Sequence, residues 1–151
     1  MKLPQHLVIS ASVSVALYVF LDVSAVIGCM IGGVLIDIDH FIDTTIYKKR
    51  FVGIKEFFLI CNTYELKNVT LVFHSIEISI VLLLIMIIVY PSPVWLIGFT
   101  IGYIIHLLCD IYYNPVHWYA YFFLHRLLNG FKSETYFNQE KLKRGNKTKS
   151  H

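Results

Sequence analysis

Two long stretches without a lysine or arginine limit what this chain can fold into. The first separates Lys2 from Lys48 and the second separates Lys67 from Arg126, and aliphatic and aromatic residues dominate both. Hydrophobic residues make up 56% of the 151 residues and charged residues only 15%, whereas soluble domains carry about a quarter charged residues. Too few charges remain to give a core of that size a polar surface, so we expect lipid to be the solvent.

Apolar runs separated by turn signals predict an all-α polytopic membrane protein with four transmembrane helices. Asp22 marks the first turn, and Pro91 and Pro93 mark the second, because proline cannot continue the hydrogen-bond ladder of a helix. A second apolar run follows the first at once, which favours an uncleaved first span over a signal peptide. The spans are expected at about residues 7–21, 23–36, 69–90 and 94–113.

The other segments predict loops and interfacial elements within one membrane domain over residues 1–131. Residues 41–67 are expected to form a basic loop with a short amphipathic helix near 54–60. Residues 116–131 are crowded with aromatic side chains, which predicts a helix lying in the membrane interface. Residues 132–151 predict a basic, disordered cytoplasmic tail.

The distribution of basic residues predicts the orientation. All thirteen lysines and arginines lie at the N-terminus, in the loop 41–67 or after residue 125, and the turns at Asp22 and Pro91 hold none. The positive-inside rule then predicts that both termini are cytoplasmic, in the inner or plasma membrane of the cell. The basic residues form no nucleic-acid motif, so the expected partners are membrane lipid and a lipid or other membrane-associated substrate, with no nucleic acid.

Ionisable side chains recur at one depth of the predicted spans. At about 1.5 Å per residue, the polar residues of all four spans fall roughly 18–24 Å from the outer turns, near the cytoplasmic face. Buried ionisable groups are costly and mark functional sites. Imidazoles together with carboxylates favour divalent cations, Zn or Mn, and this number of carboxylates allows one or two ions. The candidate metal ligands are His6, Asp37, Asp39, His40, His74, His106 and Asp110.

Local spacing within the spans agrees with a shared site. His74 and Glu77 are three residues apart and His106 and Asp110 are four apart, so each pair shares a helix face. Glu77 is the candidate general base or a further ligand, and Asp39 is a second candidate catalytic carboxylate. The alternative is that each pair only packs within the helices, and that the aspartates of residues 37–43 are solvated loop residues.

Three elements of the sequence resemble a known family. Residues 33–40 read G-V-L-I-D-I-D-H, which is similar to the G-x-L-x-P-D-x-D-H signature of the YdjM-like family of predicted membrane-bound metal-dependent hydrolases. His6, the F-H-S run at 73–75 and the G-x3-H-x3-D run at 102–110 follow in that family's order, over residues 1–114. Ile36 replaces the signature proline and a leading His-Arg pair is absent, as in a divergent branch.

Together these features predict a metal-dependent hydrolase that acts on a phosphoester or ester, such as that of a lipid, at the cytoplasmic membrane face. The alternative is a non-catalytic metal-binding or metal-transporting membrane protein. In a third interpretation, the polar layer only holds the helices together. The chain has no G-x-S-x-G element and no P-loop, which argues against serine hydrolases and NTPases.

Overall fold

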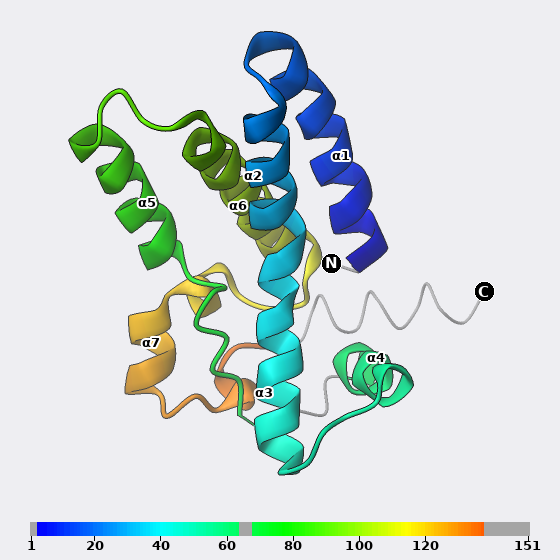
Figure 1. The fold of residues 1–151 in the computed structure, drawn as a ribbon. Helices are drawn as coiled ribbons and strands as arrows, with labels where there is room; N and C mark the ends of the chain where they lie inside the picture. The colour runs from blue at the N-terminus through cyan, green and yellow to red at the C-terminus, as the bar shows by residue number, and fades with distance from the viewer. Residues whose placement is uncertain (1–2, 64–67, 138–151) are drawn as a thin grey trace. The chain divides into compact units, whose positions relative to one another are not determined.

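The computed structural model describes residues 3–63 and 68–137 of the chain. Every regular element within these residues is a helix, and the β pairing found in them is limited to two isolated bridges (Figure 1). The expected all-α class is therefore confirmed. Of residues 132–151, which were expected to form the tail, residues 138–151 lie outside the described part.

The described residues form two compact units. The elements of the first unit are α1 (Leu3–Phe20), α2 (Val23–Val34), the 3-10 helix η1 (Leu35–Asp37), α5 (Ile76–Ile88) and α6 (Val94–Tyr113). Those of the second unit are α3 (Ile38–Lys48), α4 (Ile54–Thr63), η2 (Trp118–Tyr121), α7 (Phe123–Leu128) and η3 (Ser133–Thr135).

Three helical segments are long and apolar enough to cross a membrane: Leu3–Phe20, Val23–Lys48 and Val94–Tyr113. The last has the predicted bounds, whereas the second continues past residue 36 into the predicted loop 41–67. The expected span 69–90 is shorter than predicted, because only the 13 residues of α5 are helical. Such a helix is about 20 Å long, and the hydrocarbon core is about 30 Å thick.

Residues 69–75 are not helical, and carboxylates from α3 accept hydrogen bonds from three of their backbone N–H groups. Asp43 Oδ2 accepts hydrogen bonds from the amides of Thr70 at 2.6 Å and Leu71 at 3.0 Å. Asp39 Oδ2 accepts one from the amide of Phe73 at 2.6 Å. Leu71 adopts a φ of 41° in this loop. These bonds join residues 27 to 34 positions apart, and a reading of local hydrophobicity cannot detect them.

The range 116–131 also differs from the single interfacial helix that was expected. It holds the 3-10 helix η2 and the six-residue helix α7, separated by Phe122. The interfacial location of this range stays a prediction.

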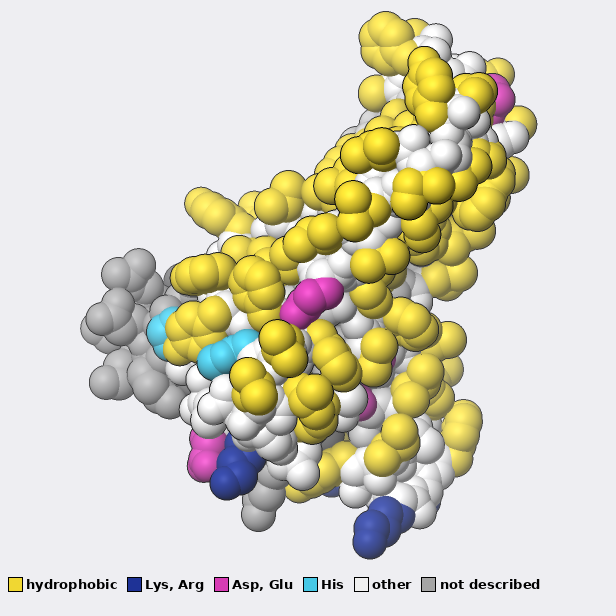
Figure 2. All heavy atoms as spheres, turned by 90° about the vertical axis from the view of Figure 1, so that its left-hand side faces the viewer, with side chains coloured by type: hydrophobic (Ala, Val, Ile, Leu, Met, Phe, Trp, Pro, Cys, Tyr) yellow, Lys and Arg dark blue, Asp and Glu magenta, His cyan; other side chains and the backbone are white. Residues whose placement is uncertain are grey.

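Small and polar side chains face the interior of the first unit, and aliphatic side chains face outward. The buried residues of α1 are His6, Ser10 and Ser14, while Val15 and Val19 on the same helix are exposed. Hydrophobic side chains also cover much of the face drawn in Figure 2. Helices in lipid associate through small residues, since the hydrophobic effect does not drive their packing, and this arrangement fits such surroundings.

Glycines bring α2 and α6 into backbone contact. A β-carbon added at Gly98 would overlap the carbonyl oxygen of Ala25, and one added at Gly102 would overlap that of Cys29. The contacts advance by four residues on both helices, so the two helices run parallel. The glycines blocked by the facing backbone are Gly28, Gly32, Gly98 and Gly102.

A methyl group at this contact should separate the helices. In Gly32→Ala the new β-carbon would overlap the carbonyl oxygen of Phe99, which is backbone and cannot move aside. We expect a loss of about 1–3 kcal/mol of stability, as for other overpacked sites. Thermal unfolding in detergent, followed by circular dichroism, measures it. Gly53→Ala is the control, because no atom lies within 4 Å of its added β-carbon; equal stability of the two variants would contradict the prediction.

Candidate metal centre

The register that brings the glycines together also brings ionisable residues together. On α6, His106 and Asp110 follow Gly102 at intervals of four residues. On α2 and η1, Gly33 and Asp37 follow Cys29, which faces Gly102, at the same interval. His106 Nδ1 lies 2.9 Å from the carbonyl oxygen of Gly33, and His106 Nε2 lies 3.6 Å from Asp37 Oδ1. The two helices therefore place an imidazole and two carboxylates at the end of the glycine contact.

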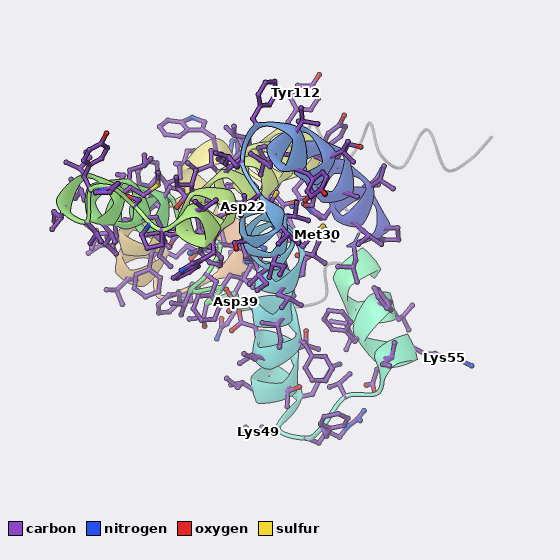
Figure 3. All side chains as sticks on the ribbon, turned by 45° about the horizontal axis from the view of Figure 1, so that its top comes forward. Asp22, Met30, Asp39, Lys49, Lys55 and Tyr112 are labelled. Carbon is purple, nitrogen blue, oxygen red and sulfur yellow. The ribbon has the colours of Figure 1, made fainter. Side chains whose placement is uncertain are left out.

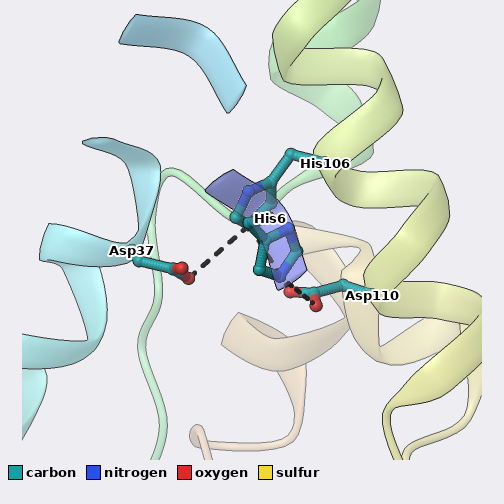
Figure 4. Close-up of side chains that lie close together, drawn as sticks. All are labelled: His6, Asp37, His106 and Asp110. Carbon is teal, nitrogen blue, oxygen red and sulfur yellow. Dashed lines mark hydrogen bonds and ion pairs between the residues drawn. The ribbon is translucent and has the colours of Figure 1, made fainter. Parts of the chain in front are cut away.

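The first helix adds a second imidazole. His6 Nε2 lies 3.1 Å from Asp110 Oδ1, and the His6 ring is stacked on that of His106 with centroids 3.8 Å apart (Figure 4). Helix α1 can approach α2 closely because Ser10, one turn after His6, lies against Gly33, where a β-carbon would overlap its hydroxyl. Three elements distant in sequence thus supply His6, Asp37, His106 and Asp110, which we call the His–Asp cluster.

The spacing of the ligand atoms fits one small cation. His106 Nε2 lies 3.5 Å from Asp110 Oδ2 and 3.6 Å from Asp37 Oδ1. One ligand atom from each residue of the cluster can be chosen so that all four lie within 4.8 Å of one another. Two ligands at about 2.0–2.1 Å from a tetrahedral zinc ion lie about 3.3–3.4 Å apart. The cluster could therefore hold a first-row divalent cation, although the stacked rings of His6 and His106 would have to turn for both Nε2 atoms to face one ion.

The proton positions also fit a ligand role for His106. A carbonyl oxygen only accepts hydrogen bonds, so His106 Nδ1 donates to Gly33 and Nε2 faces Asp37 and Asp110, where it could bind a cation. Two carboxylates in a buried site need positive charge beside them. Either protonated imidazoles or one divalent cation supplies it, and the cation balances the two carboxylates while both rings stay neutral.

Asp37 is the most accessible member of the cluster. Its side chain is 20% exposed, whereas those of His6 and Asp110 are 2% exposed and that of His106 is fully buried. Any molecule that reaches a bound cation therefore meets the side of Asp37 first. A catalytic metal site keeps an open position on its accessible side.

Three of the candidate ligands lie in the second unit. Asp39 Oδ2 is 3.5 Å from His74 Nδ1, and the rings of His40 and His74 meet edge to face with centroids 4.6 Å apart. Because the same carboxylate oxygen accepts the amide of Phe73, Asp39 fixes both the backbone before His74 and the orientation of its ring. This is the arrangement of a carboxylate that positions a histidine.

Glu77, the candidate general base, lies in the first turn of α5 and is half-buried. It belongs to the same unit as the His–Asp cluster but is not one of its four residues.

Sequence reasoning did not find Arg126, which supports the loop before His74. This buried guanidinium on α7 donates to the carbonyl oxygens of His74 at 3.1 Å and Leu71 at 2.8 Å. Asp39 and Asp43 bind N–H groups of the loop, and Arg126 binds its carbonyl oxygens. The sequence signal was a single arginine inside an aromatic segment. Such an arginine would be buried only if it were paired, so a partner could have been expected.

Comparison of the chain with family models, curated proteins and solved structures finds no match.

Loss of one imidazole should abolish tight metal binding. His106→Ala removes the residue that lies beside both carboxylates, and we expect affinity for Zn²⁺ to fall by more than about 100-fold, since changes to residues that only position ligands already cost about 10–100-fold. Equilibrium dialysis of detergent-purified protein with metal analysis measures this. His117→Ala, whose ring stacks on Tyr119, should bind as the unchanged chain does. Equal affinity of both variants would contradict the assignment.

The two aspartates should differ in their contribution to affinity. Asp110→Asn alters the carboxylate next to both imidazoles, whereas in Asp37→Asn water can replace the lost ligand on the accessible side. We expect Asp37→Asn to weaken Zn²⁺ binding by no more than about tenfold and Asp110→Asn by at least about tenfold more. Competition titrations with a chromophoric chelator measure both constants. A larger loss for Asp37→Asn would show that the accessible carboxylate is the main anchor.

Proposed function

We propose that this chain is a membrane-embedded, metal-dependent hydrolase whose cation is bound by His6, Asp37, His106 and Asp110. The observation that carries the proposal is the convergence of two imidazoles and two carboxylates from α1, α6 and η1 inside an apolar helical unit. Isolated charges in such surroundings are rare and mark functional sites. The ligand set of two imidazoles and two carboxylates favours Zn over Mn.

The chemistry that a bound divalent cation supplies is activation of water near neutral pH and polarisation of a phosphoryl or acyl oxygen. The side chains of the chain have separate roles in this proposal. Asp37 borders the accessible side, where substrate enters. Glu77 is the candidate general base, since it is a half-buried carboxylate of the same unit. Asp39 positions His74.

The substrate class follows from the surroundings of the cluster. Apolar side chains cover the outside of α1, α2 and α6, so a substrate that is itself held in the membrane can lie against this unit. We propose a phosphoester or carboxylic ester of a lipid or another membrane-associated molecule. The resemblance of residues 33–40 and 102–110 to the YdjM-like family of predicted membrane-bound hydrolases supports the same reaction class.

In the proposed topology, four crossings place both termini and the cluster at the cytoplasmic side of the inner or plasma membrane. The parallel direction of α2 and α6 supports this. Two parallel spans require the chain to cross back between them, from the end of α2 to the side on which α2 begins. Helix α5 makes that return within 13 residues. A short span is accommodated by local thinning of the bilayer.

One observation favours a second function, metal transport. Ser10 and Ser14 continue the buried face of α1 away from His6, and within the described residues the hydroxyl of Ser14 has no hydrogen-bond partner. Such a row of small polar side chains could accompany an ion through the unit. Uptake of Zn²⁺ into proteoliposomes, lost in His106→Ala, would favour transport, whereas hydrolysis without flux would favour the enzyme.

Activity assays on the purified chain test the hydrolase. We expect hydrolysis of chromogenic phosphomonoesters, phosphodiesters or short carboxylic esters that EDTA abolishes and Zn²⁺ restores. His106→Ala should be inactive, and Glu77→Gln should lower kcat by about 10²–10⁴-fold, as expected for loss of a general base, without changing metal content. His117→Ala serves as the control. Stoichiometric metal with no hydrolysis of any substrate class would exclude this proposal and leave the metal-binding alternative.

A further inference from the structure

The second unit contains a helical hairpin whose turn is fixed by its own small core. Helix α3 ends at Lys48, Lys49 adopts a φ of 52°, and the chain reverses before α4 begins at Ile54. Val52, fully buried in the turn, packs with Ile60 of α4. Tyr47, Phe57 and Val69 cover this pair. The side chains around the turn are therefore held in a defined arrangement.

Basic side chains gather at this turn. We call Lys48, Lys49, Arg50 and Lys55 the basic corner. Arg50 is paired with Glu56 at 2.6 Å, which neutralises its charge locally. Within the described part of the chain, no ion pair involves Lys49 or Lys55. Figure 3 shows Lys49 at the end of α3 and Lys55 pointing away from α4. The corner thus presents a net positive charge to its surroundings.

Large apolar side chains lie next to these lysines. Phe51 is 76% exposed and Ile54 is 73% exposed, and Ile46 on the last turns of α3 is also exposed. The Phe51 ring meets that of Phe41 edge to face, with centroids 5.5 Å apart. An acidic protein or a nucleic acid would match the charges but would leave these side chains in water. A membrane surface accommodates both, with apolar groups at the acyl boundary and lysines among the headgroups.

We propose that the basic corner and its neighbours Ile46, Phe51 and Ile54 form a binding surface for anionic phospholipid. Phosphate groups of the lipid contact Lys49 and Lys55, and the apolar side chains enter the boundary between headgroups and acyl chains. The surface lies within the second unit and involves none of the residues of the His–Asp cluster. It holds whether or not the chain is a hydrolase.

Lipid selectivity of the full-length chain tests this surface. The protein is reconstituted in phosphatidylcholine, and electron spin resonance measures the relative association of spin-labelled phosphatidylglycerol and phosphatidylcholine at its surface. We expect the unchanged chain to prefer phosphatidylglycerol. Each lysine near an anionic surface contributes up to about fivefold, so Lys49→Gln should lower the preference by up to that factor, and Lys49→Gln/Lys55→Gln should lower it further.

Two controls separate this surface from net charge and from folding. Lys132→Gln removes one exposed lysine outside the corner and should lower the preference less than Lys49→Gln does. The paired change Arg50→Gln/Glu56→Gln alters the corner without altering its net charge and should also have little effect. Zn²⁺ content, measured on every variant, reports on the His–Asp cluster independently. Absence of a preference in the unchanged chain, or an equal loss in Lys132→Gln, would overturn the proposal; in the first case an acidic protein becomes the candidate occupant.

Discussion

The close approach of α2 and α6 is the constraint on which the candidate metal centre depends. Glycines at intervals of four residues remove the side chains that would hold the two backbones apart. Because the helices run parallel, His106 and Asp110, which follow Gly102 at the same four-residue interval, lie on the face of α6 that contacts α2. His106 then reaches Gly33 and Asp37 across the contact. Helices separated by ordinary aliphatic side chains would place these ligands too far apart to bind one ion.

The small interior of the first unit also explains why its polar groups can be buried. Ser10 and Ser14 fill the α1 interface with little volume, and the aliphatic side chains of the same helix point outward. The outside of the unit is apolar, so in a membrane the two carboxylates of the His–Asp cluster would be surrounded by little bulk water. A divalent cation balances their charge while leaving both rings neutral, so metal binding and stability of the unit are coupled.

Much of the first unit could be predicted from sequence because its signals are local. Apolar length identified the span 94–113, and the four-residue spacing of His106 and Asp110 identified a shared face. The matching series of Gly98, Gly102, His106 and Asp110 was also present in the sequence and defines the register. The loop at 69–75 was not predictable, because Asp39 and Asp43 accept hydrogen bonds from its backbone amides and Arg126 donates to its carbonyl oxygens, and all three residues are distant in sequence. The helical continuation to Lys48 was not predicted either.

The central claim is that one cation binds between α1, η1 and α6. Anomalous diffraction at the zinc absorption edge, from crystals of the full chain grown with Zn²⁺, locates the ion directly. We predict one strong peak about 2.0–2.1 Å from the Nε2 atoms of both His6 and His106, with carboxylate oxygens of Asp37 and Asp110 completing the coordination. A zinc peak elsewhere, or none beside these imidazoles at saturating zinc, would contradict the account.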